Sequence, residues 1–168
     1  EGYHAGDYAR LPVTRVGKTP RVDGDLGEWS ALPFAIESSP GGVSAHARFA
    51  AAYDDRFLYV AVAVNDSRLV IRPDKPSAEL DGVDVWLEGR ADPMRSESKA
   101  WADGYQDTFL LARFSPAVSP DRAVKIPQPS YRVPLPEGLL RASRLSANGY
   151  NAEFAIPIEY LNRMQGGD

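Results

Sequence analysis

The stretch from Val43 to Val64 constrains the fold of this 168-residue chain more than any other segment. Apolar residues occupy alternate positions from Val43 to Tyr53, which is the two-residue period of a strand with one buried face. After an interruption at Asp54-Asp55-Arg56, every residue from Phe57 to Val64 is apolar, as in a central strand covered on both faces. The pattern therefore predicts an antiparallel hairpin whose second strand lies inside a sheet.

Four further segments are predicted to be strands: Val83–Glu88, Thr108–Phe114, Arg141–Ala147 and Tyr150–Ile156. In the first of them, Val83, Val85 and Leu87 are expected to face inward because they alternate with more polar positions. Asn148-Gly149 is expected to join the last two strands, since this dipeptide suits the positive φ angles of a type I′ turn. Pro157 then ends the strand, and Ile158 to Asn162 could make one helical turn.

The fold class follows from these strands and from the segments between them. Hydrophobic residues make up 43% of the chain, which suits one folded domain, and 14 Gly and 14 Pro punctuate the short runs. Gly89 to Gly104 is polar, and Ser115 to Gly138 contains six prolines, so both are expected to be long loops. The sequence predicts an all-β, antiparallel β-sandwich with long polar and Pro-rich loops.

Composition disfavours several classes of function. A net charge of −4 argues against nucleic-acid binding, which is favoured by clustered Lys and Arg. No apolar run reaches the length of about 20 residues that a membrane helix needs. The absence of Cys excludes disulfides, thiolate zinc sites and Cys nucleophiles.

Catalytic motifs are also missing, so we expect no enzyme activity. The two histidines are His4, near the start of the chain, and His46, on a predicted strand. Glycosidases need two carboxyl groups about 5 to 9.5 Å apart. Asp84 and Glu88 would be roughly 13 Å apart along one strand at 3.3 Å per residue. A pair formed between strands, such as Asp84 with Glu153, stays open at this point.

One predicted strand supplies the chemistry of a sugar-binding surface. Asp84, Trp86 and Glu88 share its outward face, so an aromatic plane could cover a pyranose while carboxylates accept hydrogen bonds from its hydroxyl groups. Trp101 lies in a polar loop and is a second candidate for ligand contact. The alternative is structural: a neighbouring sheet or loop covers Trp86, and Trp101 attaches its loop to the sandwich.

Two acidic clusters were considered as cation sites. The segment Val22 to Trp29 fails the EF-hand pattern, because the sixth position counted from Asp23 is Glu28 rather than Gly. We therefore favour a Gly-assisted turn in which Asp25 caps a short helix and Trp29 folds onto the core. Asp66 and Asp81 lie in loops that follow and precede predicted strands. A structural calcium ion bridging these two loops is the metal site that the sequence predicts.

Four segments, in order, resemble the family 9 carbohydrate-binding modules and their relatives. Pro20–Trp29 is similar to their opening "P-x-(I/V)-D-G-x-(L/I)-x-E-W", and Ala52–Val62 resembles their "Y-D-(D/E)-x-x-L-Y-V" hairpin. Leu80–Glu88 looks like their "D-(S/D)-V-E-I-F-(L/I)-D", with Asp84 for Glu and Trp86 for Phe, and Gly149–Pro157 resembles their "G-(W/Y)-x-x-E-(V/A)-A-I-P". The resemblance implies a jelly-roll-like sandwich over residues 20–168, preceded by an extension over residues 1–19.

In sugar-binding members, the resemblance implies a site for glycan ends that two Trp rings clamp, with structural calcium nearby. Asp84 stands where those members place a sugar-contacting Glu, and Arg113 lies close to where they place an Arg. One clamp Trp would fall near Ala78, so Trp86 or Trp101 would have to replace it. The second Trp lies on strands after the last motif, so either the N-terminal twenty residues replace a strand or the chain is a fragment.

The resulting hypothesis is a carbohydrate-binding module for a polysaccharide or oligosaccharide, as an accessory domain of a larger secreted or periplasmic protein. Its candidate contact residues are Asp84, Trp86, Glu88, Trp101 and Arg113. One alternative is a haem-binding relative, with axial ligands drawn from Met94, Met164, Lys99 and His46. The other is a structural or interaction domain that packs against an adjoining domain without a small ligand.

Overall fold

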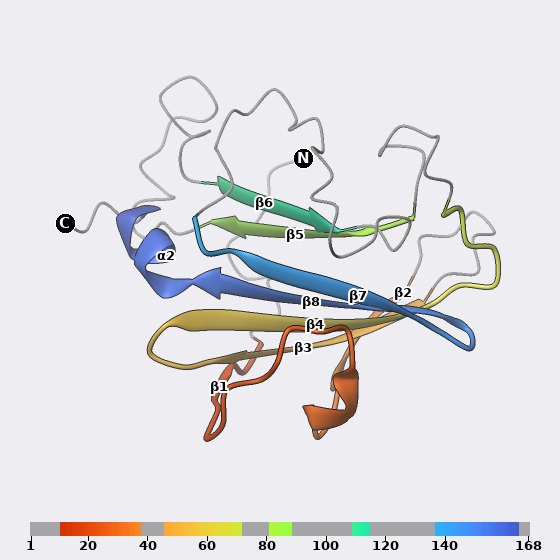
Figure 1. Cartoon of the computed structure of the whole chain (residues 1–168), viewed down its shortest axis with the longest axis horizontal. Helices are drawn as coiled ribbons and strands as arrows, with labels where there is room; N and C mark the ends of the chain where they lie inside the picture. The colour runs from red at the N-terminus through yellow and green to blue at the C-terminus, as the bar shows by residue number, and fades with distance from the viewer. Residues whose placement is uncertain (1–10, 38–45, 72–80, 89–108, 115–136, 165–168) are drawn as a thin grey trace, which may run out of the picture.

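The computed structural model describes residues 11–37, 46–71, 81–88, 109–114 and 137–164, and its strands form two stacked sheets (Figure 1). The larger, sheet A, has the order β1-β3-β4-β8-β7, with β2 also beside β3. Its strands are β1 (Thr14–Arg15), β2 (Phe34–Glu37), β3 (His46–Tyr53), β4 (Phe57–Asn65), β7 (Leu140–Ser146) and β8 (Gly149–Pro157). Sheet B pairs β5 (Val83–Glu88) with β6 (Phe109–Phe114). The helices are η1 (Leu26–Glu28) and α2 (Ile158–Met164), and no helix in the described ranges could span a bilayer.

The predicted hairpin at the centre of the sequence is confirmed. β3 and β4 pair in antiparallel register from His46 opposite Asn65 to Tyr53 opposite Leu58. β4 also pairs along its length with β8, so it is a central strand of sheet A. Its continuous apolar sequence fits this position, because neighbouring segments cover both of its faces.

The second predicted hairpin forms, but the prediction for its turn is wrong by one residue. Ser146 pairs with Gly149, so the turn residues are Ala147 and Asn148, and Gly149 is the first residue of β8. Gly149 has a φ of 152°, and a Cβ atom there would lie 2.0 Å from the carbonyl oxygen of Val64. The glycine is needed for the close approach of β8 to the end of β4.

The main core lies between the two sheets. Ala152, Phe154 and Ile156 of β8 are fully buried, and three side chains of β5 pack against them together with residues of β4 and α2. The three β5 side chains are Val83, Val85 and Leu87, as the alternation in the sequence predicted. The antiparallel β-sandwich is therefore confirmed, although β1 pairs in parallel with β3 and makes sheet A mixed.

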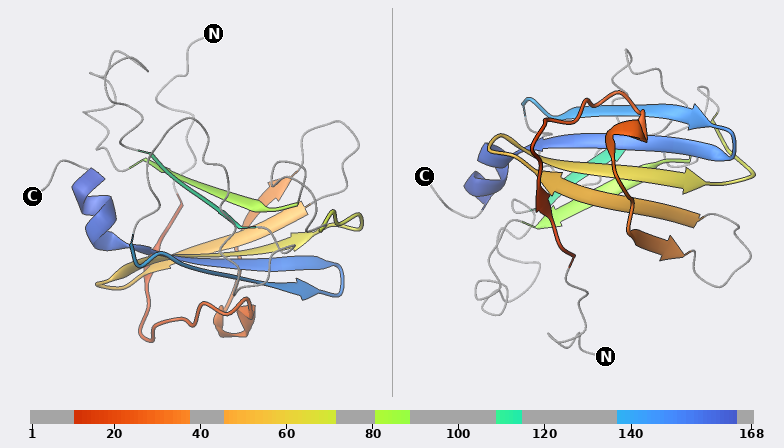
Figure 2. Two further views of the ribbon diagram at one scale, coloured as in Figure 1. Left: turned by 45° about the horizontal axis from the view of Figure 1, so that its top comes forward. Right: turned by 90° about the horizontal axis from the view of Figure 1, so that it is seen from below.

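The opposite face of sheet A, called its outer face here, is covered by the segment from Leu11 to Pro33 (Figure 2). Under this segment Ala50, Ala52 and Tyr59 are at most 6% exposed. β1 belongs to the part of the chain that the sequence predicted as an N-terminal extension, and its backbone bonds to the edge of β3 through Val16 and Tyr53. Sheet A therefore has a buried layer on each side.

Candidate functional site

The predicted sugar-binding residues lie on β5 and β6, or outside the described residues. Asp84 is exposed and lies on the face of β5 opposite Val83 and Val85, and positions 86 and 88 share that face by alternation. Asp84 is directly opposite Arg113 in the β5–β6 register. The backbone thus brings four of the five candidate positions to one face, while the fifth, Trp101, falls outside the described residues, as do the side chains of Trp86, Glu88 and Arg113.

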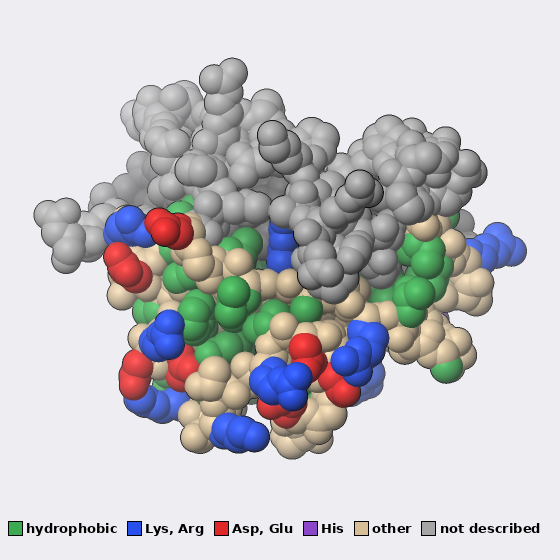
Figure 3. Space-filling view, in the orientation of Figure 1, with side chains coloured by type: hydrophobic (Ala, Val, Ile, Leu, Met, Phe, Trp, Pro, Cys, Tyr) green, Lys and Arg blue, Asp and Glu red, His purple; other side chains and the backbone are tan. Residues whose placement is uncertain are grey.

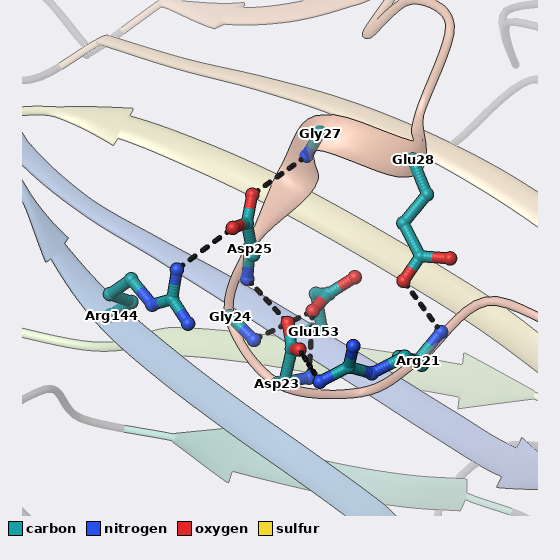
Figure 4. Close-up of polar contacts among 8 residues, drawn as sticks. All are labelled: Arg21, Asp23, Gly24, Asp25, Gly27, Glu28, Arg144 and Glu153. Atoms are coloured by element: carbon teal, nitrogen blue, oxygen red, sulfur yellow. Dashed lines mark hydrogen bonds and ion pairs between the residues drawn. The ribbon is translucent and has the colours of Figure 1, made fainter.

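A different acidic residue, Glu153 on β8, has a detailed set of partners on the outer face of sheet A (Figure 4). Its side chain is only 1% exposed. Oε2 accepts hydrogen bonds from the backbone N–H groups of Asp23 at 3.1 Å and Gly24 at 2.7 Å. Oε1 accepts one from the indole Nε1–H of Trp29 at 2.9 Å. One carboxylate thus attaches both ends of the Asp23–Trp29 loop to the sheet.

The loop itself has the local structure that the sequence predicted. Asp25 caps η1, accepting a hydrogen bond from the N–H of Gly27 at 3.0 Å, and forms an exposed ion pair with Arg144 at 2.8 Å. The Gly27 N–H and the Arg144 charge lower the pKa of Asp25. Gly24 has a φ of 79°, which favours glycine, and a Cβ there would lie 2.7 Å from the backbone carbon of Ser143. The Gly-assisted turn, the Asp25 cap and the inward position of Trp29 are confirmed.

Glu153 acts as a buried acceptor rather than as a partner for Asp84. Burial raises the pKa of Glu153, while the three N–H donors oppose that rise. Glu153 lies on the outer face of sheet A, whereas Asp84 lies on the face of sheet B that points away from sheet A. The two carboxyl groups are on opposite sides of the sandwich, so the open possibility of an Asp84–Glu153 catalytic pair is ruled out.

The turn between β3 and β4 holds a third structural carboxylate. Asp54 Oδ1 accepts hydrogen bonds from the N–H groups of Arg56 at 2.7 Å and Phe57 at 2.9 Å, and Oδ2 accepts one from the Tyr59 hydroxyl at 2.7 Å. Desolvation alone would raise the pKa of Asp54, but these donors outweigh it and lower the pKa to about 2. Burial and the Asp54 charge raise the pKa of Tyr59 to about 12. The sequence prediction that Asp54 is a turn former is confirmed.

The predicted calcium ligands already have backbone partners. Asp66 Oδ1 accepts from the N–H of Arg68 at 2.8 Å, and the Asp81 carboxylate accepts from the N–H of Val70. Within the described ranges, no three His, Cys, Asp or Glu side chains are grouped closely enough to hold a metal ion. The described donors do not make up a calcium site, and we derive no role for a metal from them.

The residues named for a haem site are not brought together by what the structure describes. His46 is exposed at the start of β3, and Met164 is the last residue of α2. Met94 and Lys99 fall in the segment 89–108, outside the described residues. Axial ligation of haem by these residues stays a sequence hypothesis.

Sequence reasoning missed a groove on sheet A with a volume of about 400 Å³, bordered by β1, the η1 segment and β2. Trp29 and Phe34 line it, Ala50, Ala51 and Ala52 of β3 form its floor, and the charged side chains are Lys18 and Glu28. Figure 3 shows acidic and basic side chains interspersed over the part of the surface where β1 and η1 lie. The segment from Leu11 to Pro33 has no clear periodicity, and its position as a wall of this groove was therefore not predicted.

Comparisons with known proteins bear on the fold. No protein-family model matches the sequence, and no curated protein matches it. A solved family 9 carbohydrate-binding module from Caldicellulosiruptor kristjanssonii, in complex with cellotriose, has a similar structure, with a TM-score of 0.53 and 18% sequence identity. The match covers 89% of this chain and 67% of that one. A structure of a family 9 module from the same organism with glucose matches at a TM-score of 0.49. The chain thus has the β-sandwich fold of the family 9 carbohydrate-binding modules.

Proposed function

We propose that this chain is a non-catalytic carbohydrate-binding module that binds the end of an oligosaccharide or polysaccharide at the outer face of β5. The observation that carries the proposal is the alternation along β5. Val83, Val85 and Leu87 pack into the core, and this leaves Asp84 exposed on the other face of a fold that a cellotriose-binding module shares. Glucans such as cellotriose are accordingly the first ligands to test.

The chemistry at this face suits a sugar. The carboxylate of Asp84 can accept hydrogen bonds from hydroxyl groups, and the register places Arg113 directly opposite on β6. A guanidinium donates several hydrogen bonds in a plane, so an acceptor and a donor group would stand side by side. Trp86 follows two positions along β5, where an indole ring would offer a stacking plane for the apolar face of a pyranose. Trp101 and Glu88 complete the proposed set.

The wider setting of the module is also a proposal. We also propose that the chain works as an accessory domain of a secreted or periplasmic protein, next to a domain that acts on the same glycan.

The test is isothermal titration of the protein with cellotriose, combined with two matched carboxylate variants. A hydrogen bond to a charged group contributes about 1.5 to 3 kcal/mol, so Asp84→Ala should weaken binding by about tenfold or more. Asp55→Ala removes an exposed carboxylate from the β3–β4 turn, where it pairs with Arg15, and should leave affinity unchanged. Equal weakening by the two variants, or no heat from a panel of glycans with the unaltered protein, would refute the proposal.

A further inference from the structure

The groove on sheet A lies where the edge of β3 is open. β2 pairs with β3 from His46 to Phe49, and β1 pairs with it at Ala52 and Tyr53. Between these two pairings, Ala50 and Ala51 have strand partners on β4 only, within the described residues. The floor of the groove is therefore a two-residue gap in the edge of the sheet.

Backbone polar groups face this gap. The carbonyl oxygen of Tyr53 accepts a hydrogen bond from the N–H of Val16 at 2.9 Å, so it points toward the β1 side of β3. Residues two positions apart in a strand direct their backbone groups to the same edge, so those of Ala51 also point to this side of β3. The parallel pairing of Thr14 with Ala52 takes up the Ala51 carbonyl, so the Ala51 N–H is the main-chain group that a ligand in the groove can meet at its base.

Two aromatic rings in the walls are held in place by contacts outside the groove. Trp29 is fixed by the hydrogen bond from its indole Nε1–H to buried Glu153 at 2.9 Å. Phe34 packs against Phe49 with ring centroids 5.1 Å apart. Rings that are already immobile lose little entropy when a ligand stacks on them, so these walls are preorganised.

The rim of the groove carries one positively charged and one negatively charged side chain, and both can form hydrogen bonds. Lys18 and Glu28 line the groove, together with the hydroxyl-bearing residues Thr14 and Ser30. The N–H of Arg21 donates to Glu28 Oε1 at 3.0 Å, which fixes the position of that carboxylate. Because the two charges offset each other, the lining favours a neutral polar ligand over an anion or a cation.

Size excludes a peptide strand as the occupant. A gap of two residues spans about 6.6 Å of strand edge, which is too short for an extended peptide to add a strand. A volume of about 400 Å³ is instead at the small end of the range for small-molecule sites. A pyranose combines an apolar ring face with a rim of hydroxyl groups, and this matches fixed aromatic walls with polar groups around them.

We propose that this groove is a second carbohydrate site, which takes one neutral pyranose unit against Trp29 over the open edge of β3. The groove lies on sheet A and the proposed Asp84 site on sheet B, so neither site depends on the other. Two sites on different faces would let one module contact two sugar units of a glycan, or two chains, and so raise its avidity.

The test is a titration of ¹⁵N-labelled protein with glucose and then cellotriose, followed by NMR. The expected result is saturable shifts of the Ala50, Ala51 and Ala52 amide signals and of the Trp29 indole signal. Ala31→Phe adds bulk to an exposed residue that lines the groove, and should weaken the affinity read from these signals by about tenfold. Ala35→Phe adds the same bulk to an exposed residue of β2 outside the lining, and should change that affinity less than about twofold.

Lys18→Gln keeps the backbone and gives a second variant if Ala31→Phe does not fold; it should weaken groove binding about threefold or more.

NMR shifts confined to residues 83–88 would overturn the groove site and support the proposed function. Shifts confined to the groove would support the second site and contradict the role of Asp84. No shifts with either sugar would overturn both proposed sites. If free proline, a zwitterion, shifted the groove signals and the sugars did not, the assignment of the groove to a sugar would be wrong.

Discussion

The two outer faces of the sandwich carry acidic side chains in contrasting surroundings. On sheet A, Glu153 is 1% exposed and accepts three N–H hydrogen bonds from the segment that covers it. On sheet B, Asp84 is exposed on the face of β5 that points away from the core. The same chemical group therefore stabilises the fold on one face and can contact a ligand on the other, and the difference lies in burial: the covering segment removes Glu153 from solvent, whereas Asp84 stays exposed.

Removing each carboxylate in turn should give the largest difference in stability between the two faces. Glu153→Ala leaves three N–H donors without their acceptor, one of them buried and two partly buried. A buried donor without an acceptor costs about 1 to 3 kcal/mol, so we expect a loss of roughly 4 kcal/mol in the free energy of unfolding. Asp84→Ala should cost less than about 1 kcal/mol, because it is exposed. Urea denaturation measures both values.

Glu153→Gln is the matched control for the first variant. Its amide oxygen can still accept hydrogen bonds, but its NH₂ group must face a donor, so its cost should fall between those of Glu153→Ala and Asp84→Ala. If Glu153→Ala were no more destabilising than Asp84→Ala, the attachment of the covering segment to sheet A would not depend on the buried carboxylate of Glu153.

A second, smaller effect tests the backbone of the covering loop. Gly24→Ala forces a side chain into a φ of 79°, with its Cβ 2.7 Å from the backbone of Ser143. Positive φ and the forced shift of the neighbour together should cost about 2 to 3 kcal/mol. Gly17→Ala, in the same segment, meets nothing within 4 Å and should be neutral or slightly stabilising. Similar thermal midpoints for the two variants would contradict the close approach at Gly24.

The same loop shows what the sequence could predict. The spacing of Asp25, Gly27 and Trp29 was enough to infer a capped turn and an inward indole, because these are local effects of capping and turn geometry. The partner of Trp29 was not predictable in this way, since Glu153 lies 124 residues away in the sequence. Glu153 was instead weighed as a catalytic residue, which shows that a motif can be recognised before its physical purpose is known.

The strands show the same division between local and distant information. β4 and β5 were predicted from their own periodicity, because burial on two faces and on one face leaves different patterns. β2 was not predicted, and β1 was anticipated only in the alternative that the N-terminal twenty residues replace a strand. The two strands have four and two residues and pair with β3, so they are too short to leave a periodic pattern. The groove they border therefore could not be predicted from the sequence, whereas the candidate residues on β5 could be proposed because they share one strand.

A change of pH should alter the stabilising contributions of two carboxylates, Asp54 and Glu153, in opposite directions. The pKa of Asp54 is about 2 when folded against an ordinary value of 3.8, so its stabilising contribution is complete above pH 3.8 and is lost as the pH falls toward 2. Burial raises the pKa of Glu153 above its ordinary 4.5, so its own contribution to stability decreases as the pH rises through its folded pKa.

Substitution distinguishes these opposite signs. Asp54→Asn should flatten the dependence of unfolding free energy on pH between about 4 and 2, measured by urea denaturation at each pH. Glu153→Gln should leave that acid limb in place and remove the decline above pH 4.5. An unchanged acid limb in Asp54→Asn would mean that the donors from Arg56, Phe57 and Tyr59 do not hold the carboxylate charged.

The smallest expected effect concerns an exposed contact of the covering segment. Arg15 on β1 donates to both oxygens of Asp55 at 2.7 Å, but the two side chains are 59% and 81% exposed. Solvent and salt screen such a pair, so Arg15→Met should lower the free energy of unfolding by at most about 0.5 kcal/mol, and by less in high salt. Chemical denaturation at low and high ionic strength gives both numbers. Arg15→Met could instead destabilise the fold about as much as Glu153→Ala. The exposed ion pair would then hold the covering segment on sheet A as strongly as the buried carboxylate does, which would contradict the contrast drawn between the two sheets.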